Sequence, residues 1–190
     1  MKRLGIDVGS TTVKLVVTDE NEKIIYKKYE RHMSNVFSKV KELLTELRDS
    51  DIFENENEKI HATITGSGGL SLSNLLAVPF EQEVISCSEA VEKLIPETDV
   101  AIELGGEDAK IPFYDVTIEQ RMNGTCAGGT GAFIDQMAVL LNTDAAGLNE
   151  AAKEYKIIYP IAARCGVFAK TDIQPLINEG AEVSEFSKPL

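Results

Sequence analysis

The sequence contains no tryptophan, only two histidines and only three cysteines in 190 residues. The cysteines, Cys87, Cys126 and Cys165, are odd in number and far apart, so they do not form the framework of a disulfide-rich secreted protein and indicate a reducing compartment. Apolar runs are short, and Asp7 interrupts the first of them too early for a signal peptide. We therefore expect a cytoplasmic protein without a membrane span.

Clusters of cations are also missing. Lys and Arg number 19 against 31 Asp and Glu, which gives a net charge of −12. We expect no nucleic-acid partner, because neutralising phosphates requires clustered cations. No Walker-type phosphate loop occurs, and no Gly-x-Gly-x-x-Gly follows a strand, so these two nucleotide-binding motifs are excluded. The hydrophobic and charged fractions, 43% and 26%, are ordinary for one globular domain or two small lobes.

Hydrophobic periodicity predicts alternating strands and helices, and hence an α/β protein. The expected strands are residues 2–8, 13–18, 23–30, 60–64, 100–104, 109–114 and 116–122. The first three should pair antiparallel because their links are short. Five helices are expected. The first follows residue 36, two begin at the capping boxes 86–89 and 171–174, one runs through Phe133 to Leu141, and one spans about 145–155.

Two segments of the chain repeat one pattern. Residues 6–14, IDVGSTTVK, align with residues 102–110, IELGGEDAK, so that Asp7 matches Glu103 and the final lysines match as well. Strand-turn-strand patterns of this kind also arise by chance. We prefer a duplicated α/β lobe, in which each lobe presents an acidic glycine turn to a shared cleft.

The first turn has the groups that hold a phosphate. Gly9, Ser10, Thr11 and Thr12 offer backbone N–H groups and hydroxyls to an anion, and Lys14 adds a cation. The carboxylate that precedes each turn can hold Mg²⁺ through water, because Mg²⁺ dehydrates reluctantly. Two such turns in one register predict a triphosphate held between two lobes.

Two of the cysteines lie in unusual surroundings. Cys126 stands in a glycine-rich loop ahead of a helix, and Cys165 is followed directly by Gly166, whereas Cys87 suits an ordinary packed helix. A catalytic cysteine needs a histidine base, and a zinc site favours Cys-x-x-Cys pairs that are absent. An iron–sulfur cluster needs four thiolates, which two chains related by a twofold axis can supply. The residues alone leave these alternatives open.

Four segments, in this order, resemble one known family: GIDVGSTTVK, IELGGEDAK, EQRMNGTCAGGTGAFID and ARCGVFAKTDIQPLINEG. They are similar to the ATP-dependent activators of 2-hydroxyacyl-CoA dehydratases, which are relatives of the ATPase subunits of benzoyl-CoA reductase. The resemblance covers essentially residues 1 to 181, and its two cysteine segments are the most specific. Two segments, IELGGEDAK and the Gly-Ser-Gly-Gly at residues 66–69, look closest to the activase domains of long multi-domain members of this family.

The resemblance implies an actin-like ATPase fold with two ribonuclease-H-like lobes, which we place at residues 1–97 and 98–190. ATP or ADP would lie with Mg²⁺ between the lobes, and a homodimer would hold one 4Fe-4S cluster. ATP binding and hydrolysis would accompany transfer of one electron. The electron would pass from a donor such as ferredoxin or flavodoxin to a partner dehydratase or reductase.

By position, the resemblance also implies the roles of individual residues. Asp7, Glu103 and Glu107 would be the catalytic carboxylates. Cys126 and Cys165 would ligate the cluster, and the helices that follow them would direct their N-termini toward it. The nucleotide would be bound by Gly9, Ser10, Thr11, Thr12, Lys14, Gly105, Gly106 and Asp108.

The chain departs from the family pattern in three places. Glu103 and Glu107 stand where many activators have Asp and Gln, and a Gly-Tyr-Gly-Arg of the family is Gly-Ser-Gly-Gly at residues 66–69. The sequence also ends at Leu190, before the glycine-rich adenosine-binding motif of family members, and its last nine residues show no helical periodicity. We therefore expect a second lobe that is incomplete at its C-terminus.

Two other functions compete with electron transfer. A small-molecule kinase of the same fold would use Glu107 or Asp108 as its base and would bury the cysteines without a cluster. A regulatory module of a larger protein would bind nucleotide without turnover. The absorption spectrum of anaerobically purified protein distinguishes electron transfer, which needs a coloured cluster, from these two functions.

Overall fold

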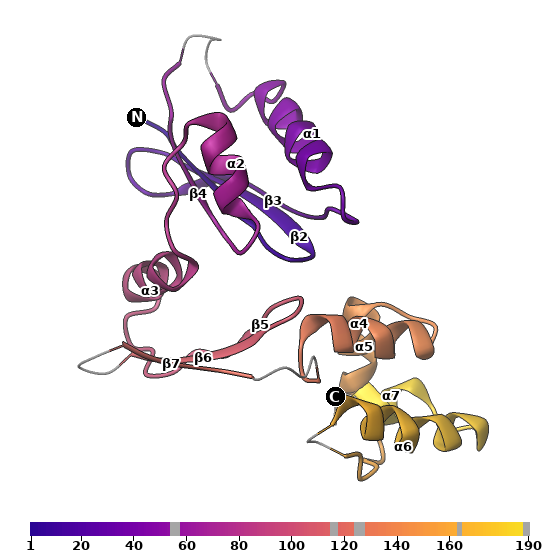
Figure 1. The fold of residues 1–190 in the computed structure, drawn as a ribbon. Helices are drawn as coiled ribbons and strands as arrows, with labels where there is room; N and C mark the ends of the chain where they lie inside the picture. Colours follow the sequence, from indigo (N-terminus) through magenta and orange to yellow (C-terminus); the bar gives the residue numbers. More distant parts are fainter. Residues whose placement is uncertain (54–57, 115–117, 124–127, 163–164, 188–190) are drawn as a thin grey trace. The chain divides into compact units, whose positions relative to one another are not determined.

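The described residues form both strands and helices, as the periodicity predicts (Figure 1). The computed structural model describes residues 1–53, 58–114, 118–123, 128–162 and 165–187. The chain divides into two compact units, Met1–Asp99 and Val100–Leu190. Each unit contains one sheet and its own helices, and the two are described in turn.

The first unit contains a four-stranded sheet in the order β3-β2-β1-β4. Its strands are β1 (Arg3–Val8), β2 (Thr12–Thr18), β3 (Ile24–Arg31) and β4 (His61–Thr65). β1, β2 and β3 pair antiparallel, and β4 pairs parallel to β1. The antiparallel pairing predicted from the short links is confirmed.

One face of this sheet carries the core of the first unit. Alternate residues of β1 and β2 are buried, and α1 (Val36–Arg48) packs on β2 and β3 while α2 (Gly69–Leu76) packs on β4 and β1 (Figure 1). α2 was not expected, because the glycines that precede it indicate only a loop. The buried core residues are Leu4, Ile6, Val8, Val13, Leu15, Val17, Val40, Leu43, Leu47, Ile64 and Leu72.

A third helix, α3 (Glu83–Leu94), begins earlier than the capping box at Ser86 predicts. Gln82 is its N-cap, and Ser88 is already inside the helix, where its hydroxyl donates to the Val84 carbonyl at 2.7 Å. Ser86, the serine of the capping box, also lies inside the helix, because its N–H donates to the Gln82 carbonyl at 3.0 Å, so the Ser-x-x-Glu pattern does not mark the helix start.

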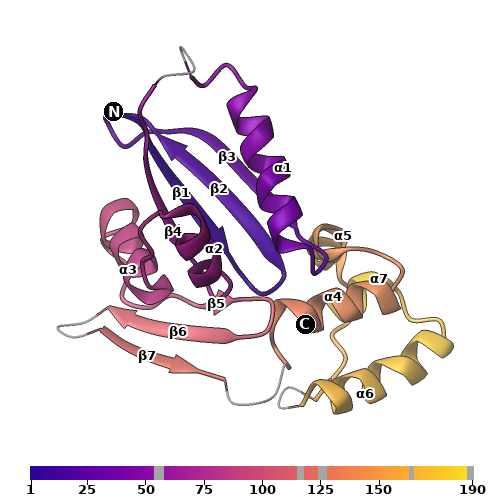
Figure 2. The same ribbon diagram turned by 45° about the horizontal axis from the view of Figure 1, so that its top comes forward.

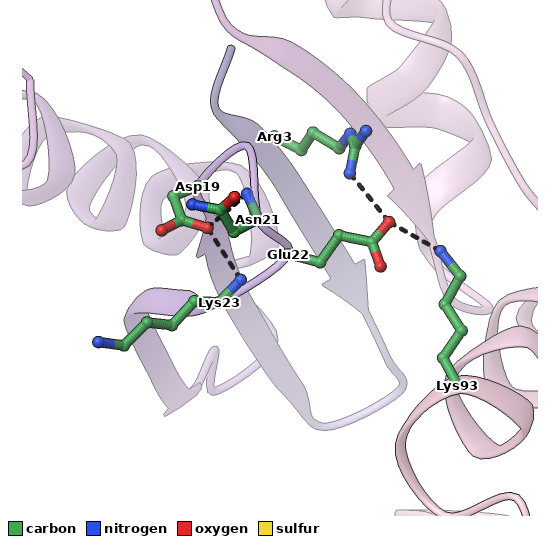
Figure 3. A network of polar contacts seen from close by, with 6 residues as sticks. All are labelled: Arg3, Asp19, Asn21, Glu22, Lys23 and Lys93. Carbon is green, nitrogen blue, oxygen red and sulfur yellow. Dashed lines mark hydrogen bonds and ion pairs between the residues drawn. The ribbon is translucent and has the colours of Figure 1, made fainter.

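An exposed ionic network ties the end of α3 to the strands of the first unit (Figure 3). The Glu22 carboxylate, in the β2–β3 turn, accepts from Lys93 at 2.9 Å and from Arg3 at 3.2 Å. The hydrogen bond from Lys93 is the main reason why the pKa of Glu22 lies below its ordinary value. In the same turn, the Asp19 carboxylate accepts from the N–H groups of Asn21 and Lys23.

The second unit combines a three-stranded antiparallel sheet with a cluster of helices. Strands β5 (Glu103–Leu104), β6 (Ala109–Tyr114) and β7 (Ile118–Met122) pair in this order, with β6 and β7 side by side in Figure 2. The helices are α4 (Gly131–Leu140), α5 (Ala145–Ala151) with a 3₁₀ turn η1 (Ala152–Glu154), α6 (Gly166–Asn178) and α7 (Val183–Ser187).

α6 begins at Gly166, so the start predicted from the Thr171–Gln174 capping box is wrong. The Thr171 hydroxyl donates to the Val167 carbonyl at 2.9 Å, and the Asp172 carboxylate accepts from the N–H of Ala162 at 2.9 Å. These side chains therefore have partners that do not cap a helix. The predicted stop is confirmed, because Gly180 has a φ of +90° just after the last turn.

The C-terminal segment contributes to the second core, although no periodicity predicts it. Phe186 of the short helix α7 is fully buried and stacks on Tyr159, with ring centroids 5.9 Å apart. The other buried members of this core are Met137, Ala138, Leu141, Leu148 and Ile173. Among the described helices, none has the length and apolar character that crossing a membrane requires.

Replacing Phe186 by alanine should lower the free energy of unfolding by about 3–5 kcal/mol, because it empties a fully buried aromatic site. Phe168 is the matched control, since its side chain is 64% exposed and its truncation should change stability little. Denaturant unfolding followed by circular dichroism measures both variants. Equal losses in the two would show that Phe186 is not a core residue.

Candidate functional site

The turn between β1 and β2 is closed by a short hydrogen bond. The N–H of Gly9 donates to the carbonyl of Thr12 at 2.9 Å. Among the described residues, no hydrogen bond uses the N–H of Ser10 or Thr11, and both residues are partly exposed. Thr12 is 5% exposed. The N–H groups that remain for an anion therefore come from Ser10 and Thr11, while the N–H of Gly9 is already used.

Asp7 is the carboxylate beside this turn. It stands opposite Lys14 in the β1–β2 register, and its Oδ2 lies 2.8 Å from the lysine Nζ. Its other oxygen, Oδ1, is buried and has no hydrogen-bond partner among the described residues. A buried carboxylate oxygen without a donor is costly. A water ligand of Mg²⁺ would satisfy it, so the Asp7 carboxylate fits the role that the sequence predicts.

β4 brings a glycine against the same carboxylate. Asp7 pairs with Thr65 in the parallel β1–β4 register, and the next residue, Gly66, has a φ of +92°. A Cβ at Gly66 would clash with Asp7 Oδ1 and with the Val8 carbonyl oxygen. Only glycine fits there. Residues 66–69 depart from the pattern of the family that the sequence resembles, but no sequence motif assigns Gly66 a role.

The hairpin of the second unit repeats the first in its register. Glu103 pairs with Lys110 and Leu104 with Ala109, as Asp7 pairs with Lys14 and Val8 with Val13. The two acids therefore hold equivalent positions in equivalent hairpins. In the second hairpin the contact is looser, because Glu103 Oε1 lies 3.7 Å from the Nζ of the buried Lys110.

The second turn is joined to the start of α4. The N–H groups of Gly131 and Ala132 donate to the carbonyls of Gly105 and Gly106, at 2.7 and 3.0 Å. These two N–H groups are therefore not available to a cluster, and the expected use of the α4 N-terminus is corrected to this extent. Glu107, predicted as a catalytic carboxylate, and Asp108, predicted to bind the nucleotide, are both exposed in the turn.

The two cysteine-bearing segments approach each other in the second unit. Cys165 is partly exposed and is the N-cap of α6, and Gly166 follows it. A Cβ at Gly166 would stand 3.4 Å from the Cα of Gly128 and 2.9 Å from the Phe133 ring. Gly128 is two residues after Cys126, which itself lies outside the described residues. An open groove of about 830 Å³ runs between α4 and α6 from this point.

The described part of one chain does not supply the ligands of a metal cluster. Within those ranges, no group of three or more His, Cys, Asp or Glu side chains could hold a metal ion. Cys87 is half-buried on α3, in the first unit, whereas Cys165 is in the second. Cys165 therefore needs thiolates from outside the described ranges or from another chain to hold a cluster.

Comparison with known proteins identifies the family. A model of the BadF/BadG/BcrA/BcrD ATPase family matches residues 4–185. This chain belongs to that family. It is 26% identical over 189 residues to the 2-hydroxyisocaproyl-CoA dehydratase activator of Clostridioides difficile, covering 97% of this chain and 69% of that protein. It is also 28% identical to the activator of lactoyl-CoA dehydratase of Anaerotignum propionicum, covering 99% and 72%.

Solved structures of dehydratase activators share the fold. The (R)-2-hydroxyglutaryl-CoA dehydratase component A of Acidaminococcus fermentans superposes with a TM-score of 0.85 at 24% identity, over 100% of this chain and 73% of that one. The activator of the 2-hydroxyisocaproyl-CoA dehydratase of Clostridium difficile, with bound ADPNP, gives 0.84 at 28% identity, over 98% and 69%. The expected actin-like ATPase fold is confirmed.

Replacing Gly66 by alanine should destabilise the protein more than the left-handed backbone alone explains, because the new Cβ meets Asp7 and Val8. Gly180 is the matched control: its φ is +90°, and nothing lies within 4 Å of its Cβ position. Gly180→Ala should therefore lower the free energy of unfolding only by the backbone strain that it introduces, about 1–2 kcal/mol. Thermal unfolding compares the two, and a Gly66→Ala loss no larger than that of Gly180→Ala would contradict the close approach.

Proposed function

We propose that this chain is an ATP-dependent activator of a 2-hydroxyacyl-CoA dehydratase-type enzyme, which donates one electron through a 4Fe-4S cluster shared by a homodimer. The convergence of the cysteine-bearing segments carries this proposal. Gly128 lies two residues after Cys126, and Gly166 directly follows Cys165. A Cβ at Gly166 would contact the Cα of Gly128, so the two segments lie close together. A kinase of the same fold has no need to bring these segments together. The names of the similar activators support the same function.

The first turn would bind the phosphates of ATP. The N–H groups of Ser10 and Thr11 would donate to phosphate oxygens, with hydroxyl groups nearby as further donors. Asp7 Oδ1 would accept from a water of Mg²⁺, while Oδ2 keeps its ion pair with Lys14. Bound Mg·ATP would supply the free energy of nucleotide binding and hydrolysis.

The second turn would complete the nucleotide site. Gly105 and Gly106 would let the backbone approach a phosphate closely, and their carbonyls are already turned to α4. Glu103 holds the position equivalent to Asp7, and both Glu103 and Glu107 would act as catalytic carboxylates. A shift of this turn on nucleotide binding would be transmitted to α4 through the bonds of Gly131 and Ala132.

Cys126 and Cys165 of two chains would supply the four thiolates of one cluster, which provides a one-electron carrier when bound. Cys165 is the N-cap of α6, so the backbone N–H groups and partial positive charge of the first turn of α6 would stabilise added negative charge there. Gly166 would keep the cysteine-bearing loops close. A low-potential donor such as ferredoxin or flavodoxin would load the electron, and a dehydratase or reductase would accept it.

Iron analysis of anaerobically reconstituted protein tests the cluster. Wild-type protein should hold about four Fe per dimer. Cys126→Ser and Cys165→Ser should each lose the iron, because on a symmetric dimer each removes two of four ligands. Cys87→Ser is the matched control and should keep it, since Cys87 is half-buried within the packed helix α3.

Size measurement on the same samples completes this test. The wild-type dimer should loosen when iron is removed, because the metal is then a cross-link between chains. Full iron occupancy in a monomer, or in Cys165→Ser, would rule out the shared cluster. A colourless protein that transfers phosphate to a small molecule would instead favour the kinase.

Replacing Asp7 by asparagine should weaken the binding of Mg·ATP by about 10- to 100-fold, the usual effect of losing a group that orients the water of a metal. It should also lower ATP hydrolysis. Asp49→Asn is the control, because Asp49 is exposed at the end of α1 and its carboxylate pairs with the neighbouring Arg48. Calorimetric titration measures both. Unchanged affinity in Asp7→Asn would remove Asp7 from the nucleotide site.

A further inference from the structure

His32 lies in the link between β3 and α1 and belongs to none of the motifs considered so far. It is buried, with 7% of its surface exposed. A buried histidine needs partners for its ring nitrogens, since unpaired polar groups are costly away from water. The partners of His32 are backbone groups, and they include the turn between β1 and β2.

Both ring nitrogens of His32 are engaged. Nε2 lies 3.2 Å from the carbonyl oxygen of Gly9, and the N–H of Ser34 donates to Nδ1 at 3.1 Å. A carbonyl oxygen can only accept and a backbone N–H can only donate. The ring that satisfies both is neutral, carries its proton on Nε2, and donates this proton to the Gly9 carbonyl.

The backbone of His32 holds a second carbonyl of the same turn. Its N–H donates to the carbonyl of Thr11 at 3.2 Å, and its own carbonyl accepts from the N–H of Asn35 at 2.7 Å, just before α1. One residue therefore fixes two carbonyls of the turn and connects them to the start of a helix.

Fixing these carbonyls also orients the N–H groups. In a trans peptide the C=O of one residue and the N–H of the next point in opposite directions within one plane. Because His32 holds the Gly9 carbonyl on its own side, the Ser10 N–H points to the other side. If that peptide rotated, the Gly9 carbonyl oxygen would face the anion and repel it.

We propose that His32 is a positioning residue, which holds the turn of Gly9 to Thr12 with the N–H of Ser10 directed at a nucleotide phosphate. This proposal rests on the proposed function, in which that turn binds ATP. The segment after His32 fits a fixed arrangement, because Met33 and Ser34 both have positive φ, at 45° and 62°. Such a conformation persists only where surrounding contacts determine it.

Two conservative variants separate the two ring contacts. In His32→Gln, the side-chain amide N–H₂ can reach the place of Nε2 and still donate to Gly9. In His32→Asn, the shorter side chain can place its oxygen near Nδ1 and accept from Ser34, but it leaves the Gly9 carbonyl without its donor. His32→Phe removes both contacts while it keeps a buried ring.

The first measurement is the affinity for Mg·ATP by calorimetric titration. His32→Asn and His32→Phe should bind about tenfold more weakly, the change that about 1.4 kcal/mol produces. His32→Gln should stay within about twofold of wild type, because it keeps the bond to Gly9. A merely structural role would not make Gln better than Asn.

The second measurement needs no nucleotide. Amide hydrogen exchange of the Gly9 N–H, which closes the turn onto Thr12, should be about tenfold faster in His32→Asn and His32→Phe than in wild type or His32→Gln. Wild-type affinity and wild-type Gly9 exchange in His32→Asn would overturn the proposal, even if His32→Phe fails to fold.

Failure of the proposed function gives a different result. In that case the wild-type protein does not bind Mg·ATP, while Gly9 exchange still reports on the turn. Faster exchange in His32→Asn but not in His32→Gln would then support the positioning of the turn by His32, and equal exchange in all variants would overturn it.

Discussion

The β1–β2 hairpin is the constraint on which the proposed nucleotide site depends. Its register places Asp7 opposite Lys14, and the bond from the Gly9 N–H to the Thr12 carbonyl leaves the N–H groups of Ser10 and Thr11 for an anion. Alternation then buries Val8 and Val13 on the opposite face. The β1–β2 register therefore fixes both the core-facing side chains and those proposed to bind ATP. A slip of one residue in this register would move each set to the other face of the sheet.

Segments distant in sequence complete the surroundings of Asp7. The parallel pairing of β4 with β1 brings Gly66 against its carboxylate, and the absence of a side chain there permits the approach. His32 holds the turn from the end of β3. The hairpin thus supplies the proposed binding groups, and its neighbours fix their directions, which is how preorganised sites limit the entropy lost on binding.

In the second unit, glycines likewise permit close approaches, here between loops and the starts of helices. Gly105 and Gly106 accept from the start of α4, and Gly166 allows the start of α6 to approach Gly128. Under the proposed function, one helix would sense the nucleotide turn and the other would follow a cluster ligand. α4 and α6 share the core around Met137 and Ile173. Because this core is closely packed, a movement of α4 would displace α6.

The sequence by itself determined the α/β class, most strands, the duplicated hairpin and the family, because period-two alternation and motif spacing are local properties. It did not determine where α3 and α6 begin: Ser86 and Thr171 match capping boxes, yet each stands inside a helix, and Thr171 bonds back to Val167. Nor did it reveal α2, the buried Phe186 or the contacts of Gly66 and His32. Those depend on groups remote in sequence, and only tertiary packing brings such groups within hydrogen-bond or van der Waals distance.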